Sequence, residues 1–298
     1  LLRAFGLSAW LAGLGGIIWA FSSYFFILIP AGHIWKFVTL AYIPPTIAGV
    51  VLAYRKKYLL GGVITALFIA LQIQSNHIQM SYYFMFVILF FIIAYFVDAY
   101  EKKELPHFFK ASAILALAAV VGVCVNISNL YHTYEYSKET MRGKSELKQE
   151  GPAANQTSSG LDRDYITNWS YGIGETLTLL VPNVKGGGCS TTLSQNETAM
   201  AKANPMYGNL YSQLTPYFGD QPWTAGPVYV GAFVVFLFIL GCFIVKGPLK
   251  WALLGATIFS ILLSWGKNFM GLTDFFIDYI PMYNKFRTVE MALVIPGM

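Results

Sequence analysis

The run QMSYYFMFVILFFIIAYFV occupies residues 79–97 and contains no charged side chain. A helix of this length, rising about 1.5 Å per residue, approaches the roughly 30 Å thickness of a bilayer's hydrocarbon core. Backbone amides in that layer must be hydrogen-bonded within the segment, and a helix meets this requirement. The run therefore predicts a membrane-spanning helix.

Six other apolar runs have the same character, and an eighth run begins near Val289. The six lie near Leu7–Ile29, Phe37–Tyr54, Leu59–Gln74, Phe108–Leu130, Ala225–Val245 and Trp251–Trp265. The composition agrees, because 56% of the 298 residues are hydrophobic and only 12% are charged, which is too apolar for a water-soluble domain. We expect an all-α polytopic membrane protein with about seven to eight transmembrane helices, in contact with the lipid bilayer.

A polar segment, Tyr131–Thr224, separates the two groups of apolar runs and holds nine of the fifteen acidic residues. Its first part, Lys138 to Gly160, predicts a helix extension followed by a flexible excursion, and its centre is aromatic enough to pack. We expect transmembrane helices 1–5 at residues 1–130, an extracytoplasmic loop of mixed structure at residues 131–224, and helices 6–8 at residues 225–298. Since the chain begins without Met and stops within an apolar run, we expect a fragment truncated at both ends.

Basic residues predict the orientation of the helices. They fall in alternate connections: at Arg3, at Arg55-Lys56-Lys57, at Lys102-Lys103 with Lys110, and at Lys246 with Lys250. Short loops rich in Lys and Arg favour the cytoplasmic side, so these connections are expected there and the long loop outside. The net charge of +5 is explained in this way, and no nucleic-acid-binding motif is present.

Polar side chains gather at the predicted outer ends of the helices, where burial is costly and function is a common reason for their presence. His33 and Lys36 follow the first apolar run, and we interpret them either as interfacial anchors or as part of an anion site. A second group, which Gln72 and Gln74 precede, either bonds between helices or recognises substrate hydroxyls. It comprises Asn76, His77 and Gln79, and Asn126 enters at the same depth from another run.

Two further features carry charge. Lys285 and Arg287 precede a predicted span on its outer side, against the usual charge bias, and a pairing of Arg with Lys suits a phosphate. The alternative is an ion pair with loop carboxylates. Glu175 is the single carboxylate of the central loop segment, and it is either an acid–base catalyst or a structural residue that caps a turn or pairs with Lys185.

Four motifs together give the chain a resemblance to a known family. They are Ala31-Gly32-His33, Ser75-Asn76-His77-Ile78-Gln79, Trp169-Ser170-Tyr171-Gly172 and Tyr283-Asn284-Lys285-Phe286-Arg287. In order and topology they resemble the YfhO-like bacterial membrane proteins, which are similar to the GT-C class of glycosyltransferases. The resemblance covers essentially the whole chain.

That resemblance implies an enzyme of the bacterial inner membrane, acting at its outer side. It would transfer a sugar from a polyprenyl-phosphate carrier to a cell-envelope polymer or lipid, and neither a cofactor nor a metal is implied. Lys285 and Arg287 would bind the carrier phosphate. His33, Lys36, Asn76, His77, Gln79, Asn126 and Tyr171 would bind substrate.

The same resemblance implies a catalytic Asp in the first outer loop, after the first span. The short loop Pro30–Lys36 contains none, so we expect that residue upstream of Leu1 and keep Glu175 as the catalytic candidate within this chain. Two alternatives stay open. A transporter or flippase of lipid-linked saccharides would show interrupted helices and midplane polar residues, whereas a non-catalytic envelope scaffold would need only the long loop.

Overall fold

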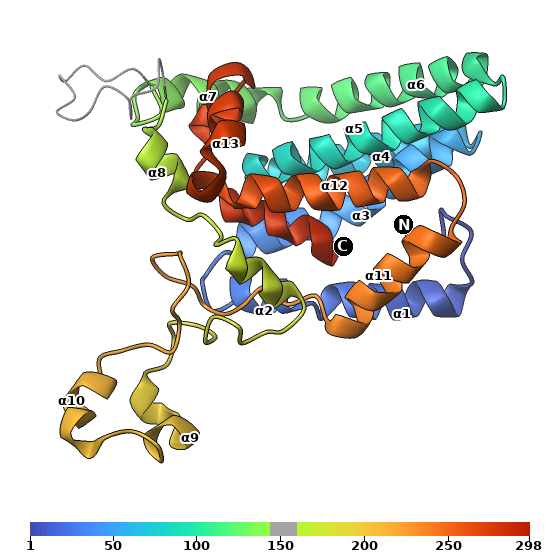
Figure 1. Ribbon diagram of the computed structural model, residues 1–298. Coiled ribbons are helices and arrows are strands. Elements are labelled where there is room, and N and C mark those ends of the chain that lie inside the picture. The colour runs from blue at the N-terminus through green and yellow to red at the C-terminus, as the bar shows by residue number, and fades with distance from the viewer. Residues whose placement is uncertain (144–159) are drawn as a thin grey trace.

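The computed structural model describes residues 1–143 and 160–298, and all regular structure in these two ranges is helical (Figure 1). This confirms the predicted all-α class. The predicted flexible excursion falls largely on residues 144–159, which lie outside the described residues. The preceding helix α7, Ile127–Lys138, ends at the residue where the predicted helix extension begins, and residues 139–143 form turns, not helix.

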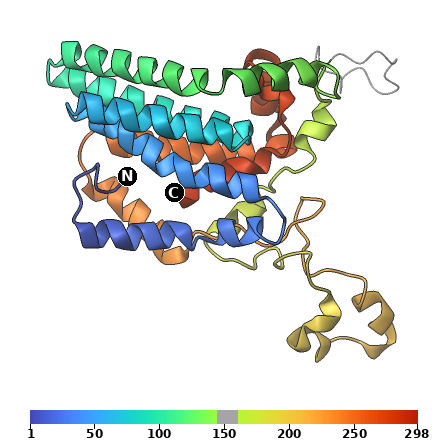
Figure 2. The same ribbon diagram turned by 180° about the vertical axis from the view of Figure 1, so that it is seen from behind.

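Five long helices form the body of the protein. They are α3 (Ile34–Tyr54), α4 (Tyr58–Gln74), α5 (Ile78–Glu101), α6 (Leu105–Cys124) and α12 (Leu249–Ser264), and they lie side by side in Figures 1 and 2. α3 packs against α4, α4 against α6, and α12 against α5 and the terminal 3-10 helix η7 (Val289–Gly297). Fully buried side chains such as Leu40, Tyr83 and Phe84 fill the space between them.

Small residues allow α3 and α4 to approach closely. A Cβ atom added to Gly61 of α4 would lie 2.5 Å from the amide nitrogen of Ala53 and 2.6 Å from the carbonyl oxygen of Gly49, both on α3. Gly49 and Ala53 are four residues apart, and so are Gly61 and Thr65. This spacing of small residues is typical of helices that pack backbone to backbone in membranes.

The helices α1 (Ala9–Ala20), α2 (Ser23–Leu28) and α11 (Ala232–Ile244) flank this body (Figure 1). Neither α1 nor α11 has a buried residue, and Trp10 is 91% exposed. Apolar helices that leave their side chains uncovered suit a lipid environment, where burial against protein is not required.

The structure supports fewer membrane spans than the sequence predicts. Four helical segments among the described residues, Ala9–Leu28, Ile34–Tyr54, Ile78–Glu101 and Leu105–Cys124, are long and apolar enough to cross a membrane. A bent pair of helices raises this number to five. The seven to eight predicted spans are not confirmed, because α4 has 17 residues and α11 only 13, and because the eighth run folds as the short 3-10 helix η7.

The bent pair is α12 followed by the 3-10 helix η5 (Gly266–Phe269) and α13 (Met270–Tyr279), which turn by 110°. Gly266 lies at the bend with φ of +44°, and a Cβ added to it would meet Ser170 and Val289. Only glycine combines this backbone conformation with such close neighbours. The bend thereby brings α13 against the long loop.

The long loop itself is built of short helices. They are α8 (Arg163–Thr167), η2 (Gly174–Leu179), η3 (Leu193–Gln195), α9 (Glu197–Met200), η4 (Pro205–Tyr207) and α10 (Gly208–Tyr211). α9 and α10 extend away from the helical body in both views, whereas residues 161–179 fold back onto it (Figures 1 and 2). The chain ends with η6 (Tyr283–Lys285) and η7, which this inner part of the loop contacts.

Candidate functional site

A cavity of ≈ 280 Å³ opens where the long loop meets the ends of α2 and α3, and we call it the loop-end cavity. Four parts of the chain that are distant in sequence contribute its wall. The side chains that carry chemistry or flank the opening are Tyr24, His33, Lys36, Trp169, Gln221, Trp223, Arg287 and Glu290. The cavity therefore combines two cations, one carboxylate and two indole rings.

Lys36 and Glu290 give the cavity its charged interior. Lys36 lies in the first turn of α3 and is 3% exposed, although no carboxylate lies within ion-pairing distance among the described residues. Glu290 lies in the first turn of η7, lines the cavity and is partly exposed there. Desolvation raises the pKa of Glu290 to about 6, against an opposing effect of the Lys36 charge.

His33 and His77 lie near this ammonium group. Burial, followed by the charges of Lys36 and Arg287, lowers the pKa of His33. Burial, followed by the charge of Lys36, lowers the pKa of His77 to about 4, and its Nδ1 atom is buried without a hydrogen-bond partner. Both imidazoles are therefore neutral at pH 7 and available as hydrogen-bonding groups, not as cations.

Arg287 is held at the cavity by contacts to its backbone and its guanidinium. The amide of Gln79 donates to the Arg287 carbonyl oxygen at 2.6 Å, which ties the start of α5 to the segment before η7. The guanidinium donates to the Tyr165 hydroxyl at 2.7 Å and lies 5.4 Å and 6.0 Å from the ring centres of Tyr165 and Trp169. These contacts fix the group while leaving it exposed.

Lys285 is directed elsewhere. Its ammonium donates to the Arg142 carbonyl oxygen at 2.6 Å, and Arg142 donates back to the Lys285 carbonyl oxygen at 3.0 Å. Lys285 does not line the loop-end cavity. The predicted alternative of an ion pair with loop carboxylates is not seen for either basic residue among residues 1–143 and 160–298; instead, Asp274 and Asp278 pair with Arg163 at 3.0 Å and 2.6 Å.

Glu175 organises the loop behind the cavity. One carboxylate oxygen accepts from the Tyr217 hydroxyl at 2.7 Å and from the Gln221 amide at 3.2 Å. The other accepts from the backbone amides of Gly172 and Asp220 at 3.1 Å and 3.4 Å. With four donors on a side chain that is 2% exposed, Glu175 has the surroundings of a structural carboxylate, not of one facing a substrate. It reaches the cavity wall through Gln221.

The other predicted residues divide between the cavity region and helix packing. Asn126, between α6 and α7, donates to the Ala70 carbonyl oxygen at 2.9 Å and so links this junction to α4. Asn76 is exposed in the turn between α4 and α5. Tyr171 is buried in the loop core, where its hydroxyl bonds Thr178. Gln72 bonds Thr46 and Ser81, which is the predicted interhelical role of an amide.

The structure adds residues that the sequence analysis did not select for this site. Glu290 stands in an apolar run, and a lone carboxylate at that depth is the signal that points to it. Trp169, Gln221 and Trp223 come from the long loop, and their approach to His33 and Lys36 follows from tertiary folding that no local pattern reports. No group of three His, Cys, Asp or Glu side chains suitable for a metal ion occurs in the part of the chain that the structure describes.

Comparison of the chain with family models, curated proteins and solved structures gives no match. The fold and the site are therefore interpreted from their own geometry: a helical protein with membrane-like apolar helices and one charged, aromatic-flanked cavity at the loop end.

Proposed function

We propose that this protein is a glycosyltransferase that takes a sugar from a polyprenyl-phosphate carrier, and that the loop-end cavity binds the carrier phosphate and its sugar. The acceptor is a polymer or lipid of the cell envelope. In this proposal the protein lies in a bacterial inner membrane with seven to eight spans, and the long loop lies on the outer side. The YfhO-like and GT-C resemblance of its motifs supports the same function.

The observation that carries the proposal is the meeting of Lys36 and Arg287 in one cavity, where neither forms a salt bridge with a carboxylate of residues 1–143 or 160–298. A buried ammonium with no ion-pair partner favours an anion as its ligand, because an isolated charge is costly to bury. Arg287 adds a planar set of donors that matches phosphate oxygens. Trp169 and Trp223 flank the opening, and indole rings are suited to the membrane boundary and to the apolar faces of sugars.

The chemistry follows from the charges. The acceptor hydroxyl attacks the anomeric carbon of the sugar, and its proton passes to a base as the bond between that carbon and the phosphate oxygen breaks. Glu290 is the carboxylate within the cavity that suits this base, since its pKa of about 6 leaves it ionised at pH 7. Lys36 and Arg287 stabilise the charge that gathers on the departing phosphate. We prefer Glu290 to Glu175 as the base because four donors already occupy Glu175.

The test compares two neighbouring basic residues. In the reconstituted protein, Arg287→Ala is expected to weaken binding of a fluorescent polyprenyl phosphate by about 10- to 100-fold, the value of one charge-assisted contact. Lys285→Ala is the matched control, because its ammonium bonds Arg142, and it is expected to bind normally. Lys36→Met should weaken binding as Arg287→Ala does. Equal binding by the wild type and the Arg287 and Lys36 variants would refute the phosphate site.

Transport of a lipid-linked saccharide is the second candidate, and the 110° interruption between α12 and α13 favours it. The two functions separate in vesicles that contain a labelled polyprenyl-phosphate sugar. Movement of intact carrier between leaflets, with no sugar transferred to acceptor, would support transport. Release of free polyprenyl phosphate together with a glycosylated acceptor would support the transferase.

A further inference from the structure

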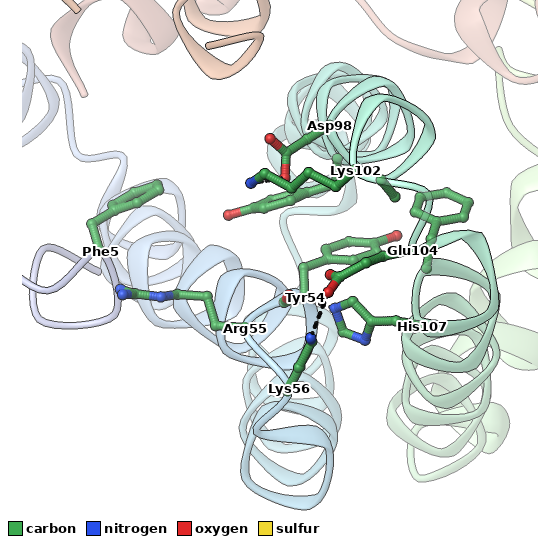
Figure 3. Close-up of a pocket in the computed structure, with 11 residues that line it drawn as sticks. Phe5, Tyr54, Arg55, Lys56, Asp98, Lys102, Glu104 and His107 are labelled. Carbon is green, nitrogen blue, oxygen red and sulfur yellow. Dashed lines mark hydrogen bonds and ion pairs between the residues drawn. The ribbon is translucent and has the colours of Figure 1, made fainter. Parts of the chain in front are cut away.

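A second cavity, of ≈ 390 Å³, lies at the opposite end of the helical body from the proposed transfer site. Figure 3 shows the residues that line it. α3 connects the two, because Lys36 in its first turn lines one cavity and Tyr54 in its last turn lines the other. At about 1.5 Å per residue, the 21 residues of α3 separate them by roughly 30 Å, the thickness of a bilayer core. We call this second site the far-end cavity.

Charged residues surround the far-end cavity. Lys56 pairs with Glu104 at 2.9 Å, and Lys102 pairs with Asp98 at 2.8 Å. Arg55 brings a third cation, so three positive groups face two negative groups and the net charge is +1. The bias is therefore toward an anion.

Of the three cations that line this cavity, only Arg55 forms no ion pair with a carboxylate of the described residues. One nitrogen, Nη1, donates to the Ala4 carbonyl oxygen at 2.6 Å, which anchors the guanidinium against the N-terminal segment. Figure 3 shows the group directed toward Phe5 and away from the Lys56–Glu104 pair. An anchored arginine with further N–H groups free for an acceptor offers the fork geometry that phosphate oxygens bind.

Aromatic rings form the floor of this cavity. Tyr54 stacks on Tyr95 with ring centres 4.5 Å apart and on Phe108 at 5.5 Å. His107 fixes the backbone beneath them, because its Nε2 donates to the Tyr54 carbonyl oxygen at 2.8 Å and its Nδ1 lies 2.7 Å from the Tyr58 hydroxyl. The floor is thus rigid before any ligand binds.

An apolar surface adjoins this cavity. Phe96 of α5 is 42% exposed and Phe109 of α6 is 60% exposed, and their rings lie 5.3 Å and 5.5 Å from that of Phe108, which lines the cavity. A ligand that pairs a phosphate with hydrocarbon chains satisfies both parts, since its charge meets Arg55 and its chains lie along these exposed side chains. A free inorganic phosphate would use only the first part.

We propose that the far-end cavity binds the head group of an anionic phospholipid, with Arg55 contacting the phosphate and Lys56 and Lys102 adding charge at its rim. Basic pockets between helices at a membrane surface are the known setting for such lipids. On the topology proposed above, this lipid belongs to the cytoplasmic leaflet. The site would tie α3, α5 and the N-terminal segment together at that surface.

The experiment titrates the detergent-purified full chain with a fluorescent phosphatidylglycerol. Arg55→Gln is expected to weaken binding at least about tenfold. Lys57→Gln, next in the same basic run but outside the cavity, is the matched control and should leave the Kd unchanged. Arg55→Lys, which keeps the charge and loses the fork, should fall between the wild type and Arg55→Gln.

Competition separates the sources of phosphate. Unlabelled phosphatidylglycerol should displace the probe, whereas phosphatidylcholine and inorganic phosphate at equal concentration should not. Displacement by inorganic phosphate as effective as that by the lipid would overturn the lipid assignment. An unchanged Kd in Arg55→Gln would overturn the site. If Arg55→Gln does not fold, an unchanged Kd in Arg55→Lys would overturn it instead.

Discussion

The side-chain amide of Gln79 donates a hydrogen bond to the backbone carbonyl oxygen of Arg287 at 2.6 Å, across 208 positions of sequence. The same nitrogen lies 3.2 Å from the Tyr83 hydroxyl. Gln79 thus connects the first turn of α5 to the non-helical residues between η6 and η7. In the proposed transferase, this bond makes Gln79 a positioning residue for the phosphate-binding arginine.

Gln79→Leu should therefore weaken carrier binding, although Gln79 itself does not contact the carrier. The part-buried Arg287 carbonyl oxygen loses its donor, at a cost of about 1 kcal/mol, and the arginine shifts to recover a partner. We expect polyprenyl-phosphate binding to weaken about five- to tenfold. Gln74→Leu, at an exposed position of α4, should bind as the wild type does. A fall of equal size in both variants would assign the effect to general loss of packing.

Glu175 provides a test of structure against catalysis. Glu175→Ala leaves the Gly172 and Asp220 amides, the Tyr217 hydroxyl and the Gln221 amide without their acceptor, and each unsatisfied buried group costs about 1–3 kcal/mol. We expect faster proteolysis and faster amide hydrogen exchange between residues 172 and 221. Glu197→Ala, at an exposed loop position, should show neither change. Intact loop protection in Glu175→Ala together with complete loss of sugar transfer would restore Glu175 as the catalytic residue.

The contact between α3 and α4 makes a prediction about stability. Gly61→Ala places a methyl group against the backbone of Ala53 and Gly49, which cannot give way as a flexible side chain would. We expect a loss of at least about 2 kcal/mol and a lower Tm in detergent, as overpacking typically causes. Gly241→Ala in α11 has open space within 4 Å and should be neutral or slightly stabilising. An unchanged Tm for Gly61→Ala would show that the two helices separate readily.

The sequence predicts the helical class well because apolar length and composition are local properties. It predicts the positions of α3 and α5 within a few residues, but the seven to eight predicted spans are not confirmed, because α4 and α11 have only 17 and 13 residues and the run after Val289 folds as a 3-10 helix. His33, Lys36 and Arg287 were selected from charge that is out of place at membrane depth, and the structure brings these three to one cavity.

Other parts of the site depend on contacts between distant segments. Lys285 and Arg287 share the same local signal, yet a backbone turn directs one to Arg142 and the other to the cavity. The sequence did not predict a role for Glu290, because it stands in an apolar run that is interpreted as lipid-facing. Only the tertiary structure shows that this run packs against protein. The aromatic contribution of Trp169 and Trp223 likewise requires the folded loop.

The pH should control phosphate binding in the loop-end cavity, because Glu290 gains or loses its charge near pH 6. Its pKa in the folded protein is raised to about 6, above the ordinary value of 4.5, so the carboxylate is neutral below about pH 6 and charged above it. Burial, followed by the charges of Lys36 and Arg287, lowers the pKa of His33, so this imidazole gains its charge at a lower pH than an ordinary histidine does. The carboxylate opposes a bound phosphate, so binding of a polyprenyl phosphate should tighten by at least about fivefold between pH 7.5 and 5.5.

Sugar transfer should show the opposite dependence, since the base must be ionised, and its rate should rise as the pH passes through about 6.

The raised pKa also affects the free energy of unfolding, because the folded state binds the proton of Glu290 more tightly than the unfolded state does. The stabilisation from Glu290 is therefore greatest below pH 4.5 and is lost as the pH rises through 6. Glu290→Gln should bind carrier more tightly than the wild type does at pH 7.5, should depend less on pH between pH 5.5 and 7.5, and should show no transfer. Retention of the wild-type pH profile in Glu290→Gln would assign the titration to another group and remove Glu290 as the base.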